Sequence, residues 1–167
     1  MPTIRKPKLK FSGTLTLRNQ PRTLVIHHAA AQHCSIEDIH QWHLNRGWIG
    51  CGYHYLIRKD GSIYQGRPQE ANGAHAVGMN AVSLGICLEG DYSVESEVPL
   101  AQLRSLVDLC RLLDLPVKFH REVGSTQCPG SNFPEEDFHR RLAEENQDAE
   151  SMIDCIILQL QQLRSIL

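Results

Sequence analysis

The chain has 167 residues, of which 41% are hydrophobic and 22% are charged, and its formal net charge is −2. This length and composition suit a single globular domain with a full core. Because no excess of one charge sign marks the chain, neither nucleic acid nor an anionic membrane surface is an expected partner.

We expect no export signal at the N-terminus. The first ten residues are basic, but the stretch FSGTLTL that follows them is too short and too polar for the core of a signal peptide. No apolar run approaches the roughly 18 residues of a membrane span. We therefore expect the protein to stay in the cytoplasm at synthesis and its six cysteines to stay reduced.

The first part of the chain predicts an arm, a buried strand and a helix. Residues 1–21 are polar and contain three prolines, which is typical of an arm or an irregular strand. The apolar, β-branched run TLVIHH (23–28) predicts a buried strand. Ser35 then begins a helix, with Asp38 completing a capping box and Gly47 ending it.

The middle of the chain predicts further strands and one long helix. Residues 54–65 contain two short apolar runs around an Asp-Gly pair, which indicates a hairpin. Residues 81–90 predict another buried strand, and residues 99–115 an amphipathic helix with a leucine stripe. Residues 116–120 predict a short strand, and Pro134 is expected to begin another helix. Strands and helices alternate around a hairpin, so we expect an α/β fold with one mixed sheet and helices on its faces.

The C-terminal segment, about residues 149–167, predicts a separate amphipathic helix. Its apolar residues recur at heptad-like spacing: Ile153, Ile156, Leu160, Leu163 and Leu167. A helix this short and apolar must bury that face, against its own domain, against a second copy as a homodimer, or against another partner. The expected organisation is an arm (1–21), a main domain (22–147) and this helix (148–167).

Two histidines and a cysteine are candidates for a metal site. His27 and His28 end the first strand, and only one of them can point into a given site because side chains alternate along a strand. His120 ends a later strand, and Cys128 lies just past the following loop. Two imidazoles and a thiolate suit zinc and leave a fourth position open for water, as in catalytic sites. From spacing alone, a buried thiol, a nucleophile and a disulfide remain alternatives for Cys128.

Four segments occur in an order and at spacings that carry a family resemblance: VIHHAA, QWHLNRGWIGCGYHYLIRKDGSIYQGRP, GAHAVGMNAVSLGICLEG and FHREVGSTQCPG. Together they resemble the zinc-dependent N-acetylmuramoyl-L-alanine amidases, in the phage endolysin branch and the related peptidoglycan recognition proteins. The resemblance covers about residues 22–135. It implies the amidase/peptidoglycan-recognition fold, with a central, mostly parallel sheet, and one zinc ion (Zn²⁺) per chain held by His27, His120 and Cys128.

The resemblance also implies roles for other residues. Tyr53 matches the catalytic tyrosine of the family. Thr126 stands where phage members carry lysine and recognition-type amidases carry threonine, and we expect it to be catalytic. The loop containing His75 borders the substrate groove in relatives, so His75, Asn80 and Arg67 are expected to bind substrate.

The general base is left open. Some relatives carry a glutamate at the position of Cys87, which this chain lacks. Glu89 lies on the same face of that strand and is either a base or a structural carboxylate. Tyr53, or water at the metal with its hydrogen-bond partners, is the favoured route. The remaining histidines of the strand and helix segments are interpreted as structural: His28, His40, His43 and His54.

The implied reaction is hydrolysis of the amide that joins the lactyl group of muramic acid to L-alanine, with peptidoglycan or muropeptides as partners. We expect a phage or prophage lysis enzyme that reaches the cell wall through a membrane pore made by another protein. A non-catalytic recognition domain is less favoured, because relatives without activity typically lack the cysteine. A cytosolic muropeptide-recycling amidase is also less favoured, because such relatives usually carry aspartate at the position of Cys128.

Overall fold

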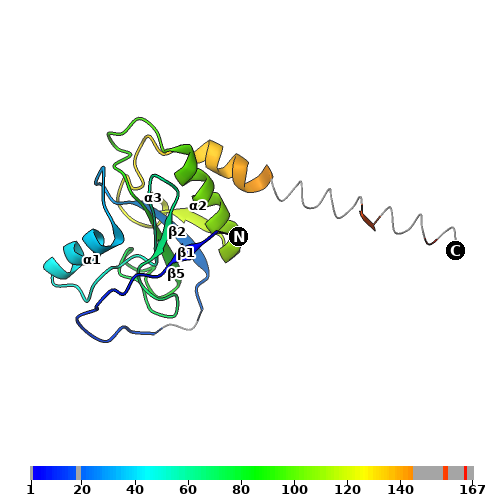
Figure 1. The fold of residues 1–167 in the computed structure, drawn as a ribbon. Coiled ribbons are helices and arrows are strands. Elements are labelled where there is room, and N and C mark those ends of the chain that lie inside the picture. Colours follow the sequence, from blue (N-terminus) through cyan, green and yellow to red (C-terminus); the bar gives the residue numbers. More distant parts are fainter. Residues whose placement is uncertain (1, 18–19, 145–155, 158–163, 165–167) are drawn as a thin grey trace. The chain divides into compact units, whose positions relative to one another are not determined.

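The structure is a computed structural model, and it describes residues 2–17, 20–144, 156–157 and 164 (Figure 1). It forms two units, Met1–Pro134 and Glu135–Leu167. Most of the predicted C-terminal helix, and with it the proposed homodimer contact, lies outside the described residues. Within the described part of the chain, no helix combines the length and apolarity needed to cross a membrane.

One six-stranded sheet forms the centre of the first unit. Its strands lie in the order β1 (Ile4–Arg5), β4 (Ile63–Gln65), β3 (Tyr55–Ile57), β5 (Ser83–Leu88), β2 (Thr23–His28) and β6 (Val117–Phe119). All neighbouring pairs are parallel except β3 and β4, which form the predicted antiparallel hairpin. The expected mixed, mostly parallel α/β sheet is therefore confirmed. The predicted arm contributes its edge strand β1.

Helices cover both sides of this sheet. Helix α1 (Ile36–Asn45) and helix α2 (Leu100–Leu113) lie on opposite sides of the strands (Figure 1). The predicted capping box of α1 is present, with the Ser35 hydroxyl accepting the Asp38 amide and the Asp38 carboxylate accepting the Ser35 amide. The short helix α3 (His120–Val123) follows β6 directly, and residues 135–144 of the second unit are helical, as predicted from Pro134.

Strand β2 lies between β5 and β6, and all six of its residues are buried. An apolar, β-branched sequence suits such a strand, because helices cover both faces of a parallel sheet. Its register places His27 opposite Cys87 of β5 and Ile26 opposite Phe119 of β6. The carboxyl ends of the three strands therefore meet at one edge of the sheet.

Four buried histidines hold backbone segments together, as the sequence predicted. In each ring, Nδ1 accepts a backbone N–H, so that nitrogen is unprotonated and the ring is neutral. The histidines are His28, His40, His43 and His54, and their donors are Tyr92, Cys51, Gly52 and Gly85, at 3.0, 3.0, 2.9 and 2.9 Å. In two of these rings Nε2 also faces a backbone carbonyl, Lys10 for His40 and Ala71 for His54.

Acid should destabilise the fold through these rings. Burial, followed by the nearby charge of Arg46, lowers the pKa of His43 from 6.5 to about 4. Because the folded state resists protonation, the stabilisation is complete above pH 6.5 and is lost as the pH falls towards 4. The loss would be up to roughly 3 kcal/mol.

His43→Asn tests this expectation, because its amide oxygen can accept the Gly52 amide without titrating. Its free energy of unfolding, measured with urea at several pH values, should fall less steeply between pH 6.5 and 4 than that of the wild type. His139→Asn, at an exposed position, is the control. Equal slopes for His43→Asn and the wild type would contradict this account of the acid sensitivity.

Candidate metal centre

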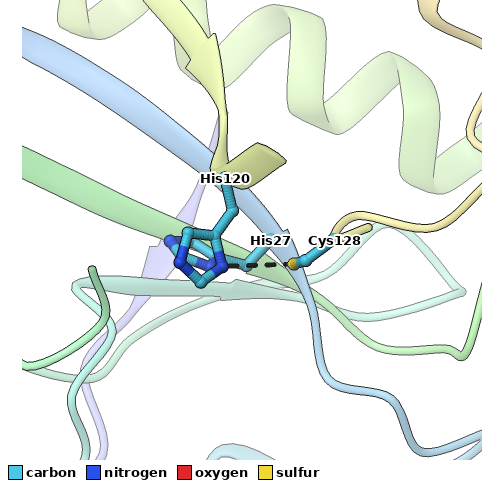
Figure 2. A group of neighbouring side chains, drawn as sticks. All are labelled: His27, His120 and Cys128. Atoms are coloured by element: carbon cyan, nitrogen blue, oxygen red, sulfur yellow. Dashed lines mark hydrogen bonds between the residues drawn. The ribbon is translucent and has the colours of Figure 1, made fainter. Parts of the chain in front are cut away.

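Three side chains from separate segments converge at the carboxyl edge of the sheet (Figure 2). His27 is the penultimate residue of β2, His120 begins α3 directly after β6, and Cys128 lies in the loop after α3. Their candidate ligand atoms all lie within 4.8 Å of one another. The Nδ1 atom of His27 is 3.8 Å from the sulfur of Cys128, and the two histidine ring centroids are 4.4 Å apart.

Backbone contacts hold the cysteine loop against the strand end. The His28 amide donates to the sulfur of Cys128 at 3.4 Å, and the Arg121 amide donates to the Cys128 carbonyl at 2.9 Å. Gly130 ends the Pro-Gly turn with φ +104°, and a Cβ there would lie 2.3 Å from the backbone of Tyr92. The turn therefore requires glycine, both for its backbone conformation and for this close approach.

The donor set fits zinc. Burial lowers the pKa of His27 and His120, so both rings are neutral and carry a lone pair. Burial raises the pKa of Cys128 to about 11, although the His28 amide and Arg121 partly oppose this, so a bound cation would have to displace the thiol proton. Two nitrogens and one sulfur are typical zinc ligands, and the spacing is on the scale of two bonds of about 2.0–2.3 Å.

Tyr53 lies beside this cluster as a hydrogen-bond donor. Its ring centroid is 5.1 Å from that of His27. Burial, with Cys87 as the next cause, raises the pKa of Tyr53 well above 10, so the phenol is protonated at neutral pH. Burial also raises the pKa of Cys87, and a hydrogen bond with Tyr53 offsets this only in part. Cys87 thus contacts the tyrosine from the adjacent strand β5.

Thr126 lies on the loop that presents the cysteine. Its Oγ1 accepts the Cys128 amide at 3.2 Å, and its own amide donates to the Gly124 carbonyl at 3.0 Å. Because the oxygen is an acceptor in this contact, the hydroxyl hydrogen can still be donated elsewhere. Thr126 is partly exposed, so it can both shape the loop and meet a ligand.

The three residues expected to bind substrate have different surroundings. The Nδ1 atom of His75 lies 3.0 Å from Nε2 of His27, so His75 contacts the candidate centre. The side-chain oxygen of Asn80 accepts the backbone amides of residues 75 and 76. Arg67 is buried and donates to two backbone carbonyls, at 2.8 and 2.7 Å, which gives it a structural role. Substrate contact by these residues stays a prediction.

Glu89 is a structural carboxylate. Its two oxygens accept the backbone amides of Cys34 and Lys59 and two N–H groups of Arg58. Burial alone would raise its pKa, but these hydrogen bonds outweigh burial and lower it. It joins the segment before α1 to the hairpin, and its oxygens are too fully used to act as a base.

The contact between His27 and His75 could not be found from the sequence. The two residues are 48 positions apart, and His75 lies in a loop, where neither strand nor helix periodicity predicts side-chain direction. The sequence offers one indication of this contact, which is the composition of the loop. His75 stands in GAHAVG, and glycines often mark a place where the backbone closely approaches another group.

Comparison with known proteins finds similar sequences and solved structures. Residues 17–131 match the family described as N-acetylmuramoyl-L-alanine amidase. The chain is 33% identical to an endolysin of Klebsiella phage KP32 over 68% of this chain and 83% of that protein. It is 34% identical to peptidoglycan-recognition protein SC2 of Drosophila melanogaster, over 70% and 72%. The solved structure of N-acetylmuramoyl-L-alanine amidase LysC from Clostridium intestinale URNW is similar at a TM-score of 0.82 and 38% identity, covering 86% and 99% of the two chains.

Replacing the cysteine should remove the metal. Cys128→Ser exchanges a soft thiolate for a neutral hydroxyl, which is a poor zinc ligand. We expect this variant to lose most of the zinc that the wild type binds, as measured by elemental analysis after gel filtration. Cys110→Ala, which removes a buried thiol of α2, is the control and should keep its zinc. One zinc per chain and unchanged affinity in Cys128→Ser would exclude Cys128 as a ligand.

Proposed function

Because the chain belongs to the N-acetylmuramoyl-L-alanine amidase family, we propose that it is a zinc enzyme that cleaves peptidoglycan. The scissile bond would be the amide between the lactyl group of N-acetylmuramic acid and L-alanine. The observation that carries this proposal is the meeting of His27, His120 and Cys128 at one edge of the sheet, with Tyr53 beside them.

The side chains of the centre would have distinct tasks. His27, His120 and Cys128 would hold the ion, and zinc supplies a Lewis acid that polarises a carbonyl and lowers the pKa of water. The two imidazoles enter as neutral donors, because burial keeps them unprotonated. Since His27 is almost fully buried, substrate and water reach the centre from the side of His120 and Cys128, which are partly exposed.

Tyr53 and Thr126 are suited to stabilise developing negative charge. The phenol of Tyr53 stays protonated, so it can donate to the amide oxygen as charge forms on it, or to the leaving amine. The hydroxyl of Thr126 is a second donor, placed by its bond to the Cys128 amide. The sequence favoured Tyr53, or water at the metal with its hydrogen-bond partners, as the route for the proton taken from water. In this proposal Tyr53 acts as a donor instead, because its phenol is protonated, and Glu89 is not the base because its oxygens accept four N–H groups.

We place this activity in phage or prophage lysis. The support is the similarity to proteins named endolysins, from Klebsiella phage KP32 and others. A second candidate is recognition of peptidoglycan without cleavage, since the chain is also similar to peptidoglycan-recognition proteins. The thiol at position 128, within ligand distance of two histidines, favours catalysis over recognition.

Defined muropeptides separate these functions. The purified protein is incubated with an N-acetylmuramoyl peptide, with and without a chelator, and the products are identified by mass spectrometry. We expect a free peptide that begins with L-alanine, its loss with the chelator, and its return when zinc is added. Binding without cleavage would support the recognition module instead, and cleavage that survives the chelator would reject zinc dependence. Cys128→Ser is the inactive control.

Tyr53→Phe should separate chemistry from binding. The variant loses a donor that acts mainly in the transition state, so kcat should fall by roughly 10²–10³ while KM and zinc content stay near those of the wild type. Steady-state kinetics on the same muropeptide measure the effect. Tyr64→Phe removes a hydroxyl from β4 that contacts Arg5, and it should leave kcat unchanged. An unaltered kcat in Tyr53→Phe would remove this hydroxyl from the mechanism.

A further inference from the structure

The two nitrogens of the His27 ring face different partners. His27 is 1% exposed, so both nitrogens face protein groups. Its Nδ1 atom lies 3.8 Å from the sulfur of Cys128, and its Nε2 atom lies 3.0 Å from Nδ1 of His75. A neutral imidazole has one N–H and one lone pair, so only one of these directions can be that of a metal.

The proton positions follow from Ser83, at the far end of the chain of contacts. The Ser83 hydroxyl donates to the Met79 carbonyl at 2.7 Å, which uses its only hydrogen. The contact of 3.4 Å between Ser83 and Nε2 of His75 therefore has the histidine as donor. A neutral His75 then has its lone pair on Nδ1, so the hydrogen bond with His27 must use the Nε2–H of His27. The lone pair of His27 is left on Nδ1, facing Cys128.

The fold leaves a close-fitting space for the His75 ring. A Cβ added at Gly73 would lie 2.4 Å from Cδ2 of that ring, and a Cβ added at Gly85 would lie 2.5 Å from its Cγ. The side chain of Asn80 accepts the His75 backbone amide at 2.8 Å and thereby anchors the loop. The absence of side chains at Gly73 and Gly85 thus leaves room for the His75 ring beside His27, and the anchored amide keeps the loop in place.

We propose that His75 is a positioning residue for the metal centre, acting through His27. By accepting the Nε2–H, it selects the tautomer of His27 whose Nδ1 can bind zinc and restrains the rotation of that ring. Ligating histidines usually donate to a carboxylate, a carbonyl or water, and such partners matter for metal affinity. Here the acceptor is a second neutral imidazole. This inference rests on the proposed zinc centre, and it gives His75 a role that does not depend on substrate.

Zinc affinity without substrate tests the role directly, by competition with a chromophoric chelator. His75→Ala should weaken zinc binding roughly 10–100-fold. His75→Asn should restore most of the affinity, because its side-chain oxygen stands as far from Cβ as Nδ1 does and can accept the same N–H. Ser83→Ala should weaken zinc binding less than His75→Ala does. This variant keeps Nδ1 of His75 as the acceptor but removes the hydroxyl that orients the His75 ring. His33→Ala removes a histidine whose side chain is 81% exposed and should bind zinc like the wild type.

Cobalt gives an independent readout of ligand geometry. In the Co²⁺-loaded proteins, the visible absorption bands should change in His75→Ala and return towards the wild-type spectrum in His75→Asn. Unchanged zinc affinity in His75→Ala, with the wild type binding zinc, would overturn this inference alone, and a raised KM would then assign His75 to the substrate. Absence of zinc binding in the wild type would overturn the proposed centre as well. If His75→Ala does not fold, full affinity in Ser83→Ala together with weakened affinity in His75→Asn would also overturn the inference.

Discussion

The parallel register of β2 between β5 and β6 is the constraint on which the site depends. It places the ends of three strands at one edge, so that His27, Cys87 and the residue after Phe119 become neighbours. Side chains alternate along a strand, so a slip of one residue would exchange His27 for His28. In the observed register, His28 instead accepts the Tyr92 amide on the other side of the sheet. The choice between two adjacent histidines is thus made by strand pairing.

Neutral imidazole rings have two roles in this protein, as acceptors of backbone amides and as candidate metal ligands. Rings that accept backbone amides join α1 to the segment at residues 51–52, and His54 to β5, and they need an unprotonated Nδ1 as much as a metal ligand does. Burial lowers the pKa of His27, His28 and His43, which favours that state at neutral pH. Stability and metal binding should therefore decline together in acid, since each depends on imidazole lone pairs that protonation removes, although in different histidines.

Much of the fold could be predicted from local sequence, because the signals were local. The capping box at Ser35, the Asp-Gly hairpin and the apolar strand over residues 23–28 each use neighbouring residues, and the structure confirms them. The choice of β1 as an edge strand could not be predicted, because two residues carry too little periodicity. The burial of Arg67 and the pairing of His75 with His27 were also missed, because both depend on loops whose path is set by tertiary contacts.

The hydrogen bond from the His28 amide to the sulfur of Cys128 comes from the main chain. No side-chain replacement at position 28 removes it, apart from proline, which lacks an N–H. The side chain at position 28 could therefore be changed, with or without keeping an acceptor for the Tyr92 amide. The hydrogen bond from the backbone amide to the sulfur of Cys128 would remain in either case. The hydrogen bond that partly lowers the pKa of the Cys128 thiol is therefore set by the backbone path at the end of β2 and not by the side chain at position 28.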